Sequence, residues 1–218
     1  MKLNTNGNVY TIVYATVMVV IVALLLAVVS SALKPKQQAN VELDRKKQVL
    51  SSLNIDIKQV KDVAQMYAEV ISEQEINGKQ VFVAATVDGT KYIIPMTGAG
   101  LWGAIWGYIA LDEDRNTIYG TFFNHDSETP GLGGEISTRG FQTRFNGKHI
   151  KAADNYQMEI VKGEAAGEQV QAISGATITS KGVETMINTT LAEYTEFLGD
   201  APAETTEQIE PIEEEVQQ

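Results

Sequence analysis

The chain has 218 residues, enough for one domain with appended segments, and it carries a formal net charge of −11. No basic stripe occurs along it, so the sequence excludes a nucleic-acid-binding surface. The absence of cysteine excludes disulfides, iron–sulfur clusters and cysteine nucleophiles, and the two histidines, His125 and His149, show no metal-ligand spacing.

The N-terminal part of the chain is a long apolar segment. Residues 3–33 contain no charged side chain, and residues 10–33 are dense in Val, Ile, Leu and Ala. This run exceeds the roughly 20 apolar residues that cross a bilayer, so we expect a short segment at 1–9 and a transmembrane helix at 10–33. A cleaved signal peptide is the alternative, because Ser30-Ser31-Ala32 resembles a cleavage site, although its apolar part is usually only about 7–15 residues long.

The charges around this segment do not decide its orientation. Lys2 precedes it, whereas Lys34, Lys36 and the run Arg45-Lys46-Lys47 follow it. A count of positive charges would leave the C-terminal domain in the cytoplasm, but long domains cross the membrane largely regardless of charge. The charge pattern alone therefore leaves both sides open.

Residues 34–75 are predicted to form a helical connector. Apolar side chains recur at helical spacing from Leu43 to Leu53, with charged residues on the other face. A second helix is predicted to start near Asp56, with an apolar stripe from Val60 to Ile71. Both patterns are typical of amphipathic packing helices without chemistry of their own.

Residues 76–198 are predicted to form the main domain, and its first half alternates with a period of two. Two pairs of strands are each joined by a turn signal. They are 80–87 with 91–94 around Asp88-Gly89, and 104–111 with 117–123 around the polar residues 112–116. A helical turn at 141–145 and strands at 156–161 and 169–173 follow. Consecutive hairpins indicate an α+β fold, a mostly antiparallel sheet flanked by helices.

Two glycine-rich segments, residues 97–103 and residues 125–134, interrupt the strand pattern. Neither is a Walker A loop, and neither opens a dinucleotide-binding βαβ unit. Backbone amides freed by glycine beside apolar side chains suit a flat heteroaromatic ligand, and two irregular turns are the alternative interpretation. Glu128 is the acidic residue of interest, because it lies inside the second segment.

The short motif Ser174-Gly175-Ala176-Thr177 follows the strand predicted at 169–173. A hydroxyl, two small residues and the start of a helix together can hold a phosphate, because the backbone is accessible and free N–H groups favour an anion. An ordinary strand-to-helix corner is the alternative, and the local physics favours it.

The C-terminal part of the chain is predicted to be a helix followed by a tail. Apolar residues at helical spacing predict the helix at 183–198, for which Ser180 is a candidate N-cap. Residues 199–218 contain seven acidic residues and no Lys or Arg, so this tail is predicted to be disordered.

No conventional catalytic set accompanies these segments. Ser174 lacks the G-x-S-x-G elbow of a hydrolase nucleophile, and the acid pair Asp112 and Asp114 lies in a predicted turn. We therefore expect no catalytic residue and no metal site, so that any chemistry comes from a bound cofactor.

Three motifs stand in order behind the apolar segment. They are Gly98-Ala99-Gly100-Leu101-Trp102-Gly103, Glu128-Thr129-Pro130-Gly131-Leu132-Gly133 and Ser174-Gly175-Ala176-Thr177. Together they strongly resemble the C subunit of the Na⁺-translocating NADH:quinone reductase, over nearly the whole chain except the acidic tail. The G subunit of the Rnf electron-transport complex shares the second and third motifs but generally lacks the Gly-Leu-Trp form of the first.

The resemblance implies a cofactor and the residues that hold it. In this family FMN is attached through its phosphate, as a phosphoester, to the final residue of the Ser-Gly-Ala-Thr motif, which is Thr177 here. Ser174, Gly175 and Ala176 complete that motif, and Lys181 would lie close to the phosphate at the helix N-terminus. The flavin pocket would be lined by residues of the other two motifs. These are Gly100, Leu101, Trp102, Glu128, Thr129, Pro130, Gly131, Leu132 and Gly133.

One position departs from the family pattern. An acidic residue commonly stands six positions before the flavin-bearing threonine, and this chain has Gln171 there. If that acid assists the flavin transferase, attachment here is slower or uses other contacts.

The resemblance also implies a role and a location. We expect a single-pass inner-membrane subunit with its FMN-binding domain on the periplasmic side, against the charge count. It would relay electrons in a complex that oxidises NADH, reduces quinone and moves Na⁺. Its partners would be the other subunits, membrane lipid and a flavin transferase, and NADH would bind elsewhere because no dinucleotide fingerprint is present. The alternatives are the Rnf subunit and a membrane-anchored binding or scaffold domain without redox function.

Overall fold

A computed structural model of the chain describes residues 7–76, 78–152 and 155–199. It divides into two compact units, one up to Arg45 and one from Lys46 onward. The acidic tail predicted to be disordered lies outside the described residues from position 200 on. Most of the short segment predicted at 1–9 lies outside them as well.

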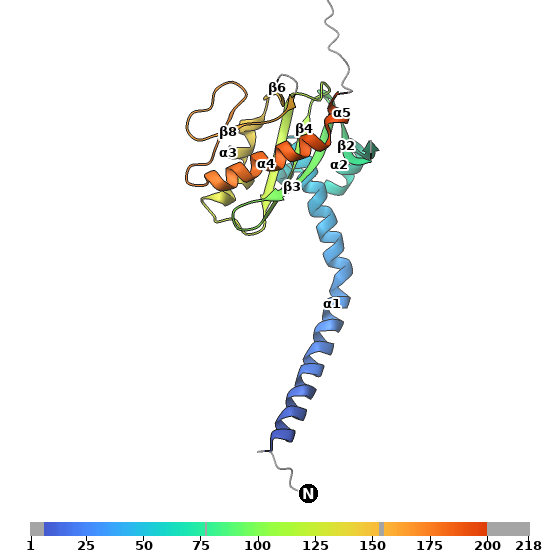
Figure 1. The fold of residues 1–218 in the computed structure, drawn as a ribbon. Helices are drawn as coiled ribbons and strands as arrows, with labels where there is room; N and C mark the ends of the chain where they lie inside the picture. The colour runs from blue at the N-terminus through green and yellow to red at the C-terminus, as the bar shows by residue number, and fades with distance from the viewer. Residues whose placement is uncertain (1–6, 77, 153–154, 200–218) are drawn as a thin grey trace, which may run out of the picture. The chain divides into compact units, whose positions relative to one another are not determined.

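The first unit is the greater part of one helix, α1 (Asn8–Ser52), which Figure 1 colours blue to cyan. Among the described residues it is the one helix long and apolar enough to cross a membrane, in agreement with the span predicted at 10–33. The helix does not end at Leu33. It continues through Pro35, whose missing N–H removes one helical hydrogen bond, and the helix predicted from Leu43 to Leu53 is its continuation.

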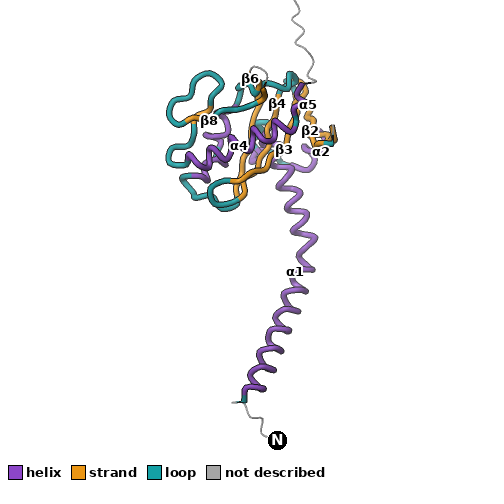
Figure 2. Tube along the Cα trace, in the orientation of Figure 1, coloured by secondary structure: helices purple, strands orange, loops and turns teal. Residues whose placement is uncertain are grey.

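The second unit is built on a five-stranded antiparallel sheet in the order β1-β2-β3-β4-β5, so the predicted α+β class is confirmed (Figure 2). The strands are β1 (Ile71–Ile76), β2 (Lys79–Thr86), β3 (Gly89–Ala99), β4 (Ala104–Leu111) and β5 (Ile118–His125). Both predicted hairpins are present. The first turn is Val87 and Asp88, one residue earlier than predicted, because Gly89 already pairs with Thr86.

The segment before the sheet differs from the prediction. One helix from about Asp56 to Ile71 is replaced by η1 (Ile57–Gln59), α2 (Val63–Val70) and the strand β1. The carboxylates of Asp56 and Asp62 each cap a new helix, so two short helices form where the apolar stripe predicted one. The strand β1 escaped prediction because most of it is polar and exposed.

Between β5 and α4 the chain has short elements. They are η2 (Gly133–Ser137), α3 (Arg139–Gln142), η3 (Thr143–Phe145), β6 (Lys151–Ala152), β7 (Asn155–Tyr156), β8 (Ile160–Val161) and β9 (Val170–Gln171). The helical turn predicted at 141–145 is present as α3 and η3. The strands predicted at 156–161 and 169–173 are shorter than expected, and β8 pairs in parallel with β9.

The described chain ends with α4 (Thr177–Glu193) and α5 (Thr195–Gly199). α4 starts six residues before the predicted position 183, with Ala176 as its N-cap. The prediction of Ser180 as N-cap is wrong, because its side chain lies inside the first turn. There the hydroxyl accepts the N–H of Ile173 and donates to the carbonyl of Ala176.

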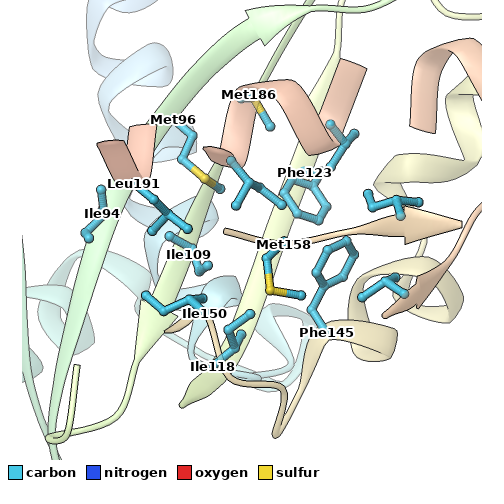
Figure 3. Packing of buried hydrophobic residues seen from close by; sticks show 14 of the residues in the cluster. Ile94, Met96, Ile109, Ile118, Phe123, Phe145, Ile150, Met158, Met186 and Leu191 are labelled. Carbon is cyan, nitrogen blue, oxygen red and sulfur yellow. The ribbon is translucent and has the colours of Figure 1, made fainter. Parts of the chain in front are cut away.

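Both faces of the sheet are covered by apolar side chains. On one face the larger core joins strand residues such as Ile94 and Ile109 to Leu191 of α4, as Figure 3 shows. On the other face Leu50 and Ile93 belong to a second cluster with residues of α2. Neighbouring residues Ile93 and Ile94 thus serve different cores, as the alternation of side chains along a strand requires.

The packing of α4 on β3 is close at Gly182. A Cβ at this position would lie 2.5 Å from the carbonyl oxygen of Ala99, so the absence of a side chain allows the two backbones to approach. The first turns of α4 are thereby placed beside the residues that follow β3, which form the first glycine-rich motif.

Candidate functional site

The three motifs border one pocket of about 340 Å³. Nine of the predicted site residues line it: Leu101, Trp102, Glu128, Thr129, Leu132, Gly133, Gly175, Ala176 and Thr177. Five others lie outside this lining: Gly100, Pro130, Gly131, Ser174 and Lys181. Three lining residues were not predicted: Lys162, Ile178 and Thr179. The structure therefore brings together residues that are up to 78 positions apart in the chain, Leu101 and Thr179.

Thr177 is an exposed residue at the very start of α4. The N-cap residue Ala176 has no polar side chain, and no side chain caps this end of the helix. The first N–H groups of a helix lack partners within the helix and favour an anion, so this end suits a phosphate. The hydroxyl of Thr177 thus lies where a phosphorylated group can be held.

The other hydroxyls nearby are either buried or away from the helix start, as is Thr129, which is exposed and lines the pocket but lies in the loop after β5. Thr179 and Ser180 are buried and make hydrogen bonds to Glu128 and Ala176, respectively. Ser174 is exposed, but it precedes the helix and lies outside the pocket lining. Gly175, which separates Ser174 from the N-cap residue Ala176, has a φ of +79°, a conformation that a glycine adopts without strain. Thr177 is therefore the exposed hydroxyl that combines the helix start with the pocket.

The rim of the pocket is apolar and exposed. Leu101, Trp102, Leu132 and Ile178 all expose more than a third of their surface, with Trp102 at 68%. Such side chains around a concave site suit a ligand with a flat apolar part. This agrees with the ligand type that the two glycine-rich segments predicted.

Glu128 is held inside the pocket wall and is only 4% exposed. Its Oε1 accepts the N–H of Trp102 at 2.8 Å, and its Oε2 accepts the hydroxyl of Thr179 at 2.6 Å. Burial alone would raise the pKa of this carboxyl. Hydrogen bonds from Thr179 and from the backbone around Trp102 outweigh burial, so the pKa lies below its ordinary value and the group is ionised at neutral pH.

Two glycines of the motifs make room for this carboxylate. A Cβ at Gly100 would lie 2.4 Å from Oε1 of Glu128, and a Cβ at Gly133 would lie 2.2 Å from Oε2. Any side chain at either position would therefore displace the carboxylate. This gives Gly100 a structural role although it does not line the pocket.

The two lysines near the helix start have different surroundings. Lys181 places its Nζ 2.8 and 2.7 Å from the two carboxylate oxygens of Glu184. Lys162 is exposed, lines the pocket with Thr177 and forms no ion pair with any residue in the described part of the chain. It reaches this place because β8, which precedes it, runs parallel to β9, which leads to Ser174. No local sequence pattern links residues 162 and 177, so Lys162 was not predicted.

The fold and the pocket define a class of protein. A family model described as the FMN-binding domain matches residues 100–192, which include the whole pocket lining. The crystal structure of the C subunit of the Na(+)-translocating NADH-quinone reductase from Parabacteroides distasonis is 38% identical, with a TM-score of 0.70, and the match covers 76% of this chain and 96% of that one. This chain belongs to the family of Na(+)-translocating NADH-quinone reductase C subunits, which confirms the resemblance drawn from the three motifs.

Further relatives agree with this assignment. The C subunit of the reductase from Haemophilus ducreyi is 28% identical over 84% of this chain and 89% of its own length. The C subunit from Vibrio anguillarum is 41% identical, but the match spans only 44% of this chain and 39% of that protein. The crystal structure of Shewanella oneidensis NqrC, at 20% identity and a TM-score of 0.62, shares the fold over 72% of this chain.

Proposed function

We propose that this chain is a membrane-anchored subunit of a Na⁺-translocating NADH:quinone reductase and relays electrons through an FMN bound covalently at Thr177. The observation that carries the proposal is the position of Thr177, an exposed hydroxyl at an uncapped helix N-terminus that lines an apolar-rimmed pocket. Membership of the reductase family and the match to the FMN-binding domain support it.

The residues around the pocket fit the two ends of FMN. The N–H groups at the start of α4 and the free cation of Lys162 would hold the phosphate. Leu101, Trp102 and Leu132 offer apolar surface to the isoalloxazine. When bound, the flavin supplies the redox chemistry that the side chains lack.

The covalent bond would be a phosphoester on the Oγ1 of Thr177. The phosphoryl group replaces the proton of the hydroxyl, so the isoalloxazine stays chemically unaltered. Exposure of Thr177 means that a flavin transferase can reach this oxygen in the folded domain. Gln171, where the resemblance led us to expect an acid, is exposed on β9 and is not among the residues that line the pocket.

The anchor and the partners follow from the same proposal. α1 would cross the inner membrane once, in contact with lipid, and the FMN-binding domain would lie on the periplasmic side. NADH oxidation and Na⁺ passage would belong to partner subunits, because this chain has no dinucleotide fingerprint and a single apolar span.

The test is covalent flavin on a denaturing gel. The full chain is produced with a flavin transferase, and in-gel flavin fluorescence is compared with that of Thr177→Ala and Ser174→Ala. We expect fluorescence in the wild type and in Ser174→Ala, and none in Thr177→Ala. Lys162→Ala should lower flavin incorporation more than Lys181→Ala, because Lys181 is already paired with Glu184.

The alternatives give different results. A wild-type band without fluorescence favours a binding or scaffold domain without redox function. Fluorescence that persists in Thr177→Ala places the attachment elsewhere. Co-purification with Rnf subunits instead of quinone reductase subunits would assign the chain to the other complex.

A further inference from the structure

The carboxylate of Glu128 joins the first two motifs to the helix turn that follows the third. Glu128 belongs to the second motif, its Oε1 binds the N–H of Trp102 in the first, and its Oε2 binds Thr179, two residues after the end of the third. These hydrogen bonds are 2.8 and 2.6 Å long, and the residue that accepts them, Glu128, is only 4% exposed. One buried group therefore connects both sides of the pocket.

The first motif folds around this carboxylate. The N–H of Gly100 donates to the carbonyl of Gly103 at 2.8 Å, which closes residues 100–103 into a tight loop. The backbone N–H groups of Leu101, Trp102 and Gly103 all favour the ionised form of Glu128. Among them the N–H of Trp102 makes the hydrogen bond to Oε1, so the anion held by this loop is a side chain of the same protein.

The other oxygen reaches the turn that carries Thr177. Thr179 lies two positions after Thr177 in the first turn of α4, is 1% exposed and donates its hydroxyl to Glu128. The loop 100–103 supplies Leu101 and Trp102 to the pocket rim, and the turn supplies Thr177. The carboxylate of Glu128 is thus hydrogen-bonded to both of these parts of the pocket.

We propose that Glu128 is a positioning residue: its carboxylate fixes the loop 100–103, and with it Trp102, against the first turn of α4, so that the flavin is received in a preformed pocket. Glu128 then acts on the flavin through Trp102 and Thr179 rather than by supplying a free carboxylate. This role depends on the proposed function for its effect on flavin, but its effect on Trp102 is independent of flavin.

The first measurement uses the protein without flavin. The full chain is produced in detergent without a flavin transferase and with Trp106→Phe, which leaves Trp102 as the single tryptophan. Time-resolved fluorescence anisotropy then reports the local motion of Trp102. We expect a larger fast component in Glu128→Gln and in Thr179→Val, and an unchanged decay in Thr179→Ser, which keeps the hydroxyl.

Matched controls separate this effect from general damage. Glu184, like Thr179, lies on α4, and its carboxylate accepts the backbone N–H of Ile160 instead of one from the loop 100–103. Glu184→Gln therefore removes a comparable carboxylate without touching the bonds of Glu128. Thr190→Val is a buried threonine change later in α4. Both should leave the anisotropy of Trp102 unchanged.

The second measurement is the initial rate of covalent flavin attachment with the transferase present. A hydrogen bond to a charged group contributes enough that its loss should slow attachment by about tenfold in Glu128→Gln and Thr179→Val. Thr179→Ser should retain a rate close to that of the wild type.

The outcomes are distinguishable. Unchanged anisotropy of Trp102 in Glu128→Gln and Thr179→Val overturns the proposal, whatever happens to flavin. A larger fast component of Trp102 with no decrease in the rate of flavin attachment also overturns it, because a fixed loop 100–103 would then not be needed to receive the flavin. If the wild type takes up no flavin, the proposed function fails, while the anisotropy still decides whether Glu128 anchors the loop.

Discussion

The ionisation of Glu128 links the stability of the domain to pH. Burial opposes the charge, but hydrogen bonds from Thr179 and the loop 100–103 keep the pKa of the carboxyl below its ordinary value. A group with a lowered pKa stabilises the fold above its unfolded pKa, about 4.3 for Glu, and this stabilisation is lost as pH falls through the folded pKa. We expect the wild type to exceed Glu128→Gln in unfolding free energy by about 2 kcal/mol near neutral pH.

This difference should shrink as the pH falls below the unfolded pKa of about 4.3 and vanish once the pH has passed through the lower folded pKa of Glu128. The measurement is the thermal midpoint of the full chain in detergent, followed by near-ultraviolet circular dichroism at several pH values. Comparison with the variant at each pH removes the contribution of the other carboxyls. Glu75→Gln, on the exposed strand β1, is the control and should follow the wild type. A difference that stays constant with pH would contradict the argument.

Single residues of the site differ in how far the sequence could reveal them. Thr177, which lines the pocket, was predicted because its motif is contiguous and resembles that of a known family, whereas the local physics alone favoured an ordinary strand-to-helix corner. Lys162 and Thr179 were not, since they join the pocket through the parallel pairing of β8 with β9 and through a bond to Glu128, 51 positions away. Lys181 was predicted from its distance along the chain, and the structure pairs it with Glu184 instead.

The position of α4 on the sheet depends on Gly182. Alanine is favoured over glycine inside a helix by about 1 kcal/mol, so propensity alone predicts that Gly182→Ala stabilises the protein. The structure predicts the opposite, because a Cβ would lie 2.5 Å from the carbonyl oxygen of Ala99. We expect Gly182→Ala to lower the unfolding free energy by about 1–3 kcal/mol, as for other overpacked sites.

The control for this prediction is Gly140→Ala. Gly140 also lies in a helix, α3, but its nearest neighbour for an added Cβ is the hydroxyl of Thr138 at 4.0 Å. Its thermal midpoint should stay the same or rise. Flavin attachment should slow in Gly182→Ala alone, since a displaced α4 moves Thr177 away from the loop 100–103. An unchanged midpoint in Gly182→Ala would show that α4 is not fixed by this contact.

Elements with a clear local pattern were predicted well and the others were not. The two hairpins combine alternating apolar residues with turn signals, and both are present. The strand β1 has exposed polar residues from Ser72 to Glu75, so it is defined by pairing with β2 and not by its own sequence. The start of α4 was placed too late because three of the four residues in its first turn are polar. Tertiary contacts such as those of Thr179 and Ser180 hold this turn in place.

The two units of the molecule, which divide between Arg45 and Lys46, differ in how much of their side chains is buried. The side chains of α1 from Asn8 to Glu42 are exposed, as in Leu25 at 62% exposure, and the apolar part of this stretch is long and apolar enough to cross a membrane. Val49, Leu50 and Leu53, by contrast, are at most 3% exposed and belong to the core on one face of the sheet. The last two turns of α1 are therefore part of the folded domain.

A chain that begins at Asn40 should consequently fold, remain soluble without detergent and take up flavin at Thr177. A chain that begins at Asn54 lacks Val49, Leu50 and Leu53. Truncation of one buried leucine costs about 2–5 kcal/mol, so loss of this group removes much of the 5–15 kcal/mol that stabilises a typical domain. We expect the shorter chain to aggregate or to unfold at a much lower temperature.

In the full chain Leu50→Ala should lower the thermal midpoint in detergent, whereas Leu25→Ala should not. Equal stability of the two truncated chains would show that the end of α1 contributes nothing to the domain.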